Sequence, residues 1–393
     1  MAELEPQYKI LREGYPLGLR EDACLALLSP RYATCRACEN ICPVRAIHVG
    51  ETALTLDESC LNCGRCVAVC PMGELAMPGF TIPDIKQDSP GSLFVDCWKV
   101  PRKVSPDDAV RVPCLGGVSA GRIADLAVSA GERPVIFLDR GWCTACRAGG
   151  GDNGGHPVHS ALETARLLLE KAGMAAGELP RLESLPLPVE HLPVEIPAPV
   201  TEQQLSRRAF FSALASKTVG AIEQVKPLMP QTELRRRRGF EREPVLSRER
   251  KRLLSGLQFF VQRTGQILPA ELFYRLEISD ACRNHLLCAK VCPTGALDIY
   301  EEEKQSGLVF DHFACIGCGH CVTVCPSDAI KLLPNGDNPV SGESVKMTCF
   351  GEKDCPECGC RYSASGDENL CPQCAKRRNL ASSAFRTLFG GGA

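Results

Sequence analysis

Two short stretches of this chain, residues 60–71 and 315–326, share one cysteine pattern, C-x2-C-x2-C-x3-C-P. Three thiolates on one tight loop can reach three irons of a cubane iron–sulfur cluster, and the fourth, before the proline, ligates a second cluster nearby. Zinc sites rarely combine three cysteines at this spacing with a following x3-C-P. The pattern therefore predicts that each stretch binds iron–sulfur clusters.

The total number of cysteines favours metal ligation over disulfides. The chain has 25 cysteines among 393 residues, whereas disulfide-dense proteins are small and secreted. Its N-terminus is polar and charged, and no apolar run approaches the roughly 18–20 residues that span a bilayer. The formal net charge of −2 argues against a surface that coats nucleic acid. We expect a globular, cytoplasmic protein and leave peripheral membrane association open.

The surroundings of the two stretches also repeat. In each copy a Cys-Pro-x-x-Ala-apolar segment, at residues 42–47 and 292–297, leads into two short alternating strands and then the cysteine stretch. On these residues the chain resembles the bacterial two-cluster ferredoxin family, over residues 24–80 and 280–330. The resemblance implies one [4Fe–4S] cluster on Cys42, Cys60, Cys63 and Cys66, and another on Cys292, Cys315, Cys318 and Cys321.

The remaining site of each copy departs from the family pattern. In the first copy Tyr32 stands where the leading cysteine is expected, and Cys24 would complete the set; otherwise the site holds a [3Fe–4S] cluster or none. In the second copy His285 replaces a cysteine. It either ligates iron, which raises the reduction potential, or lies beside a [3Fe–4S] cluster as a hydrogen-bond donor. The candidate ligands of these two sites are Cys24, Cys35, Cys38 and Cys70, and Cys282, His285, Cys288 and Cys325.

Residues 110–139 are predicted to form a strand, a helix and a strand, and cysteines follow both strands. One interpretation is a thioredoxin-like pair at Cys143 and Cys146, but the glycine-rich segment that follows cannot form the helix such a pair needs. The other pools four ligands: Cys97, Cys114, Cys143 and Cys146. Residues 93–173 then resemble the iron–sulfur subunit of methyl-viologen-reducing hydrogenase, which implies a [2Fe–2S] cluster and electron transfer to heterodisulfide reductase. Structural zinc or free buried thiols stay open as alternatives.

Two cysteine knuckles lie near the C-terminus, twelve residues apart. Four thiolates from two such turns give tetrahedral coordination, so this region resembles a zinc ribbon. The predicted zinc ligands are Cys355, Cys358, Cys371 and Cys374. Cys349 and Cys360 are left over as candidate packing residues.

Residues 147–281 contain no cysteine and separate two metal-rich halves. Within them, residues 156–173 are predicted to form a helix that ends at a glycine, and residues 180–199, with six prolines, an extended linker. Helical spacing recurs over 205–225 and 251–276. Four arginines at 235–238 suggest a charged docking arm for an acidic redox partner, and the twin-arginine-like motif at 206–211 is interpreted as part of a surface helix.

These features predict an α+β multidomain protein with two ferredoxin-like modules. The expected divisions are a first ferredoxin module at 1–90, a small α/β cysteine-containing domain at 91–178, a proline-rich and basic linker with a helix at 179–255, a second ferredoxin module at 256–340, and a zinc ribbon with a tail at 341–393.

The function we expect is that of an iron–sulfur electron-transfer subunit, a polyferredoxin, acting with redox partner subunits of an oxidoreductase. Hydrogenase, formate dehydrogenase and heterodisulfide-reductase-like complexes are the candidate assemblies. The sequence has no P-loop, and we expect no substrate turnover by this chain alone. One alternative is a ferredoxin-linked thiol–disulfide reductase that uses Cys143 and Cys146. Another is nucleic-acid binding by the ribbon and arginines, which an aromatic content of 6% disfavours.

Overall fold

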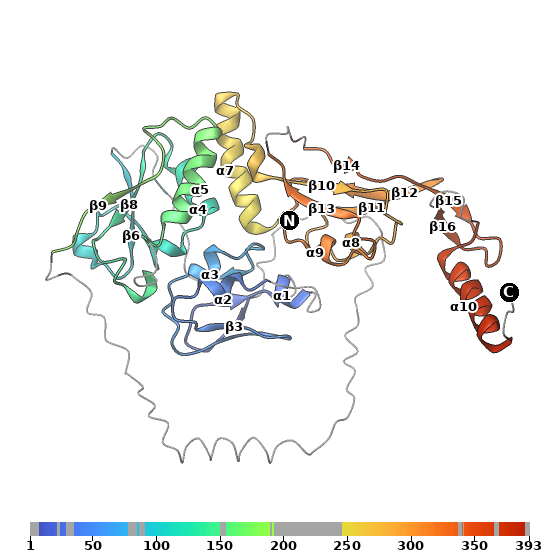
Figure 1. Cartoon of the computed structure of the whole chain (residues 1–393). Coiled ribbons are helices and arrows are strands. Elements are labelled where there is room, and N and C mark those ends of the chain that lie inside the picture. Colours follow the sequence, from blue (N-terminus) through green and yellow to red (C-terminus); the bar gives the residue numbers. More distant parts are fainter. Residues whose placement is uncertain are drawn as a thin grey trace, which may run out of the picture. The chain divides into compact units, whose positions relative to one another are not determined.

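A computed structural model (Figure 1) describes the residues on which the predicted sites lie, with the exception of Tyr32. The described ranges are 8–21, 24–28, 35–77, 85, 91–149, 155–188, 191, 246–336, 340, 342–364 and 369–389; for 364 and 381–389 only the backbone is described. The predicted helix at 205–225, the twin-arginine-like motif and the arginines at 235–238 lie outside these ranges.

The first cysteine repeat forms short helices around a hairpin, as predicted. Strands β3 (Ile47–Val49) and β4 (Leu54–Leu56) pair antiparallel, with Ile47 opposite Leu56. Their apolar residues alternate with polar ones, so one face of the hairpin packs into the core. The other elements are helices α1 (Leu25–Leu28), α2 (Ala37–Ile41) and α3 (Arg65–Ala68), and a three-stranded sheet of β1 (Lys9–Ile10), β2 (Gly18–Leu19) and β5 (Leu75–Ala76).

The middle region is a parallel sheet with helices. Strands β7 (Val110–Val112), β6 (Leu93–Cys97), β8 (Val135–Asp139) and β9 (Arg181–Ser184) lie side by side in that order, all parallel. The predicted strand–helix–strand unit is present as β7, α4 (Ala120–Ala130) and β8, and the predicted helix over 156–173 is α5 (His159–Lys171). Three short 3-10 helices complete this region: η2 (Arg102–Val104), η3 (Leu115–Gly117) and η4 (Arg147–Gly149).

Two expectations for the chain after residue 173 were wrong in detail. Residues 181–184 were expected in an extended linker, but they form β9 and pair with β8, because the sheet edge supplies backbone partners that a linker lacks. The helix expected over 251–276 is α7 (Arg248–Thr264). Gly265 ends it in the left-handed conformation (φ 72°), as glycine often does, and the chain continues into η7 (Ala270–Leu272) and β10 (Tyr274–Ile278).

The second cysteine repeat has the same layout as the first, with longer strands. Helix α8 (Leu287–Lys290) precedes a hairpin of β11 (Leu297–Glu302) and β12 (Gln305–Phe310), and α9 (His320–Thr323) follows it. Strand β10 pairs with β13 (Ile330–Pro334). The C-terminal region extends the hairpin sheet, because β12 also pairs with β14 (Val345–Lys346) and with β15 (Phe350–Asp354), which pairs with β16 (Arg361–Ala364). Helix α10 (Pro372–Phe389) closes the described chain.

Helix α7 contacts the first cysteine repeat, the parallel-sheet region and the second cysteine repeat through three consecutive residues of its first turn. The backbone N–H of Arg248 donates to Met72 O in the first repeat, at 3.3 Å. The Glu249 carboxylate accepts from the Gly121 N–H at 2.8 Å, at the N-terminus of α4 where the helix dipole favours an anion. The Arg250 guanidinium donates to Phe313 O (2.6 Å) and His312 O (3.2 Å) in the second repeat.

The core reflects this joining. One buried apolar cluster combines side chains of the first repeat, of the parallel sheet with α4 and α5, and of α7, including Leu257 and Phe260. A separate cluster lies within the second repeat. Figure 1 shows α7 beside α4, and the boundary expected between 255 and 256 falls inside α7. Among the described residues, no helix is long and apolar enough to cross a membrane.

Candidate metal centres

The regular site of the first repeat is a cavity walled by thiols. Its lining includes all four cysteines that the spacing assigns to one cluster: Cys42, Cys60, Cys63 and Cys66. The backbone N–H of Ala46 donates to Cys42 Sγ at 3.2 Å, a contact of the kind that tunes cluster potentials. Burial raises the pKa of the Cys66 thiol well above its usual range, and repulsion from the other three thiolates adds to it. Protonation relieves this repulsion in the absence of metal, and ligation of a metal cluster would relieve it by replacing the protons.

The four candidate ligands of the irregular site of the first repeat interact electrostatically. Burial, with a smaller contribution from repulsion by Cys70, Cys35 and Cys24, raises the pKa of Cys38 to about 12. Burial also raises the pKa of Cys24, and repulsion from Cys70 and Cys35 contributes to the rise. That Cys24 completes this site stays a prediction.

The regular site of the second repeat mirrors that of the first. Burial raises the pKa of Cys321 to about 12, with repulsion from Cys318, Cys292 and Cys315 adding to the rise. The Leu297 N–H donates to Cys292 Sγ at 3.4 Å. In the first repeat Cys42 accepts from Ala46, one position earlier in the aligned segment, so the corresponding cysteine of each repeat accepts a backbone hydrogen bond.

His285 lies in the wall of a cavity at the irregular site of the second repeat. Cys282, Cys288 and Cys325 line the same cavity. Asn284 and Leu286, on either side of His285, both adopt positive φ angles, 51° and 61°. His285 is exposed and shares this cavity with the three thiols. Its two possible roles, ligand or hydrogen-bond donor, stay predictions.

The four middle cysteines line one cavity of ≈ 370 Å³, part of it open to solvent. The parallel sheet explains why they meet. Cys97 ends β6, Cys114 follows β7, and Cys143 and Cys146 follow β8. These three strands are neighbours, and the carboxyl ends of parallel strands converge at one edge, where sites in such sheets form. The four cysteines that were grouped from the sequence therefore lie together at one edge of the sheet.

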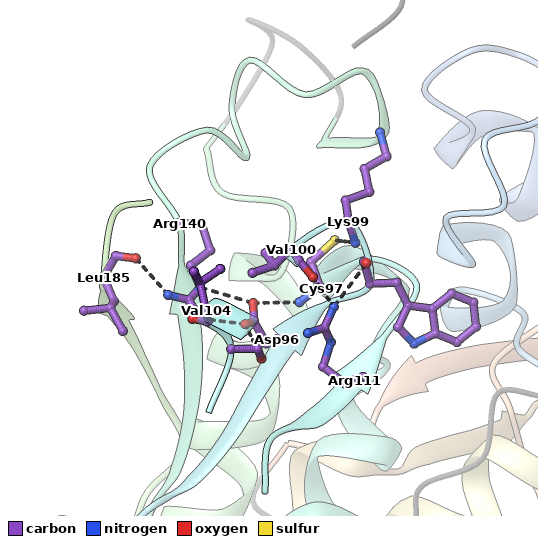
Figure 2. A network of polar contacts seen from close by, with 10 residues as sticks. Asp96, Cys97, Lys99, Val100, Val104, Arg111, Arg140 and Leu185 are labelled. Atoms are coloured by element: carbon purple, nitrogen blue, oxygen red, sulfur yellow. Dashed lines mark hydrogen bonds and ion pairs between the residues drawn. The ribbon is translucent and has the colours of Figure 1, made fainter. Parts of the chain in front are cut away.

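A buried ion pair supports two of these loops (Figure 2). Asp96 Oδ2 lies 2.7 Å from Arg140 Nη2, and Asp96 Oδ1 accepts from the Cys97 N–H at 2.9 Å. Arg140 also donates to Leu185 O and Val104 O, at 3.3 and 3.4 Å. Sequence reasoning missed this pair because its members are distant in the chain, although each stands close before a cysteine.

Cys143 is poorly suited to act as a redox nucleophile. Burial, with a contribution from the nearby Asp139 carboxylate, raises the pKa of Cys143 to about 12. A reactive dithiol needs a lowered pKa, because the thiolate is the nucleophile. His156 and Asp139 lie with Cys143 in one group of ligand-type atoms, and Lys99 Nζ lies 3.8 Å from Cys146 Sγ. These neighbours were not identified from the sequence.

The C-terminal knuckles meet as the spacing predicts. The Sγ atoms of Cys355, Cys358, Cys371 and Cys374 all lie within 4.8 Å of one another. The Cys371 N–H donates to Cys355 Sγ at 3.4 Å and, with other hydrogen bonds, lowers the pKa of Cys355 to about 6. Cys360, left over in the sequence, has its Sγ 2.7 Å from that of Cys358. Four thiols in this arrangement fit a tetrahedral metal ion.

Comparisons with known families identify both repeats as iron–sulfur cluster-binding domains. Residues 280–329 match the family described as a 4Fe-4S dicluster domain. Residues 32–79 match the LdpA Fe-S cluster-binding domain. The chain is therefore a ferredoxin-type iron–sulfur protein at these two positions.

Curated relatives match over short stretches. Polyferredoxin protein MvhB of Methanothermobacter marburgensis is 36% identical over 73 residues, 17% of this chain and 17% of the relative. The polyferredoxin-like subunit of the aliphatic sulfonate oxidoreductase of Pyrococcus furiosus is 30% identical over 95 residues, 24% and 51%. A ferredoxin-type methylamine utilization protein, MauM of Paracoccus denitrificans, is 33% identical over 84 residues, 18% and 36%. The matched stretch spans at most about half of each of these relatives.

Proposed function

We propose that this protein is a polyferredoxin-type electron-transfer subunit that relays electrons within a multi-subunit oxidoreductase. The observation that carries the proposal is that thiols meet in the sets that the spacing of each repeat assigns to clusters, most directly in the cavity lined by Cys42, Cys60, Cys63 and Cys66. A thiol-walled site in an iron–sulfur domain stores one electron when its cluster is bound.

The proposed cofactors follow the observed sets. Four cubane sites would use the four thiol-rich sets of the two repeats, with Cys24 and His285 completing the irregular ones. Cys97, Cys114, Cys143 and Cys146 would hold a [2Fe–2S] cluster, and the C-terminal knuckles would hold zinc. The support for zinc is that four thiols lie at mutual distances suited to one ion. The proposed role of this ion is structural: it would stabilise a small fold.

The proposed partners are other redox subunits. The polyferredoxin-like relative from Pyrococcus furiosus is named as a subunit of an oxidoreductase, which supports a similar place for this chain. Hydrogenase, formate dehydrogenase and heterodisulfide-reductase-like complexes remain the candidate assemblies. The raised pKa of Cys143 disfavours a thiol–disulfide reductase in which Cys143 is the nucleophile.

The test is a metal analysis of the full chain purified without oxygen. Five clusters and one zinc predict about 18 iron atoms per chain, with matching acid-labile sulfide. About 16 would mean that the middle set carries no cluster, and about 14 would indicate three-iron clusters at the irregular sites as well. Near 8, only the two regular sites would be filled. A chain that binds no iron after anaerobic reconstitution would overturn the proposal.

A further inference from the structure

We propose that the five cysteine sites form one unbranched series with the middle site at one end and the His285 site at the other. This inference rests on the proposed function, because it orders the clusters that the function requires. The order runs from the middle site to the regular and then the irregular site of the first repeat, and on to the regular and then the irregular site of the second repeat.

The first link joins the middle site to the regular site of the first repeat. Cys63 lines both cavities. Arg65 Nη1 donates to Ala148 O at 3.3 Å, and a Cβ added at Gly117 would lie 2.5 Å from Cys63 O. The loop after β7 therefore packs directly on the cysteine loop of the first repeat. Only glycine at 117 permits this approach.

The second and fourth links run within the repeats and are equivalent. In the first repeat α2, which carries Cys38, packs against α3, which carries Cys66. In the second, α8 with Cys288 packs against α9 with Cys321. Each helix pair thus separates two neighbouring sites.

The third link joins the two repeats through the first turn of α7. Arg248 N–H binds Met72 O, two residues after Cys70. Arg250 binds Phe313 O, two residues before Cys315. These hydrogen bonds hold one loop of the irregular first site and one loop of the regular second site on the same helical turn.

Cys70 belongs to the irregular site of the first repeat, and Cys315 belongs to the regular site of the second. Because one turn of α7 binds the loop after Cys70 and the loop before Cys315, the irregular site of the first repeat lies next to the regular site of the second.

The series gives the relay two ends. An electron supplied at one end by a one-electron reductant moves stepwise along the series. Each site that gives up the electron is oxidised by one electron, and the next site is reduced by one electron. A one-electron acceptor at the other end receives it. The His285 and middle sites, whose predicted ligands or cluster types differ from the rest, occupy the two positions at which partner redox groups exchange electrons with the chain.

Magnetic coupling between reduced clusters tests the order on the full, iron-loaded chain. Electron paramagnetic resonance of the dithionite-reduced Cys35→Ala variant should show narrowing and slower relaxation of the signals from the regular sites of both repeats. The coupling between the two sites of the second repeat should persist. The Cys349→Ala variant, which changes an exposed cysteine outside the proposed sites, should behave like the natural protein. If Cys35→Ala loses iron while the signal from the regular site of the second repeat is no narrower than in the natural protein, the series is wrong.

A second variant leaves every ligand in place. Arg250→Met removes the hydrogen bonds to the second repeat, whereas Lys251→Met changes the exposed neighbour on the same turn. We expect unchanged iron content in both, and loss of coupling between the repeats in Arg250→Met alone. Coupling that survives in Arg250→Met and in Cys35→Ala would overturn the order. A chain that never binds iron would instead overturn the proposed function, so the two failures are distinguishable.

Discussion

Asp96 and Arg140 form a buried ion pair, 2.7 Å from Oδ2 to Nη2, one residue before Cys97 and three before Cys143. The pair fixes the spacing of two loops that approach the middle site from adjacent strands. If the charge of either partner is removed, the other charge stays buried without a counter-charge. The resulting loss of folding free energy exceeds the net contribution of the intact pair.

The first prediction concerns this pair. Asp96→Asn should lower the free energy of unfolding by about 3–5 kcal/mol, because Arg140 would stay buried without its counter-charge. It should also reduce iron at the middle site. Urea unfolding without oxygen and iron analysis measure the two effects. Glu302→Gln, which breaks the exposed pair with Lys346, should cost about 0–1 kcal/mol. Equal losses in both variants would contradict the assignment.

The second prediction concerns the contact at Gly117. Gly117→Ala should destabilise the protein by about 1–3 kcal/mol, because its Cβ would overlap the backbone near Cys63. It should also weaken the coupling between the middle site and the first repeat. Gly177→Ala is the matched control, because nothing lies within 4 Å of the added Cβ. Thermal unfolding compares the two variants. A Gly117→Ala variant as stable as the natural protein would show that the loops do not touch.

The third prediction concerns Cys24. Cys24→Ser should convert the irregular site of the first repeat to a [3Fe–4S] cluster, with loss of about one iron per chain and a new signal in the oxidised state. The cause is the loss of the fourth thiol near Cys35, Cys38 and Cys70. Cys349→Ser should leave the iron content unchanged. If Cys24→Ser also retains its full iron content, another residue ligates this cluster.

The fourth prediction concerns His285. Replacing a neutral ligand with a thiolate adds negative charge, so His285→Cys should lower the potential of that site, by on the order of 100 mV, without loss of iron. A redox titration monitored by electron paramagnetic resonance gives the shift. His48→Cys, at an exposed position in β3, serves as control. A gain of about one iron in His285→Cys would instead identify a three-iron site with His285 beside it.

The fifth prediction concerns the knuckles. Cys355→Ser should release zinc and leave iron unchanged, whereas Cys360→Ser should retain zinc. Hydrogen bonds from backbone N–H groups, led by that of Cys371, lower the pKa of Cys355 to about 6, so its thiolate is present at neutral pH and is protonated as the pH falls through about 6. Zinc affinity should therefore fall over that range. Zinc that survives Cys355→Ser at stoichiometric level would exclude this site.

Local patterns predicted the local structure well. The cysteine runs, the hairpins at β3–β4 and β11–β12, and the strands before Cys114 and Cys143 all follow from period and spacing over a few residues. The length of α7 was overestimated, although Gly265 was a stop signal in the sequence. Strand β9 was missed because proline-flanked residues carry little strand signal when their partner lies about 45 residues earlier.

The relations between sites could not be predicted, because they depend on contacts between distant segments. Nothing near Cys63 or Cys114 in the sequence indicates that their loops pack together, nor that Arg250 binds the carbonyl before Ala314. Such contacts are fixed by the packing of α7 on α4 and by the order of the parallel strands. A single sequence carries no periodic signal for either.

The first turn of α7 sets the relative positions of the regions that carry the sites. Successive residues of an α-helix point about 100° apart, so Arg248, Glu249 and Arg250 form hydrogen bonds with three different regions from one turn. Insertion or deletion of a single residue there would rotate every later position to the wrong partner. We expect this turn to tolerate single substitutions but no change in length. The direction in which each of its residues points determines which regions become neighbours.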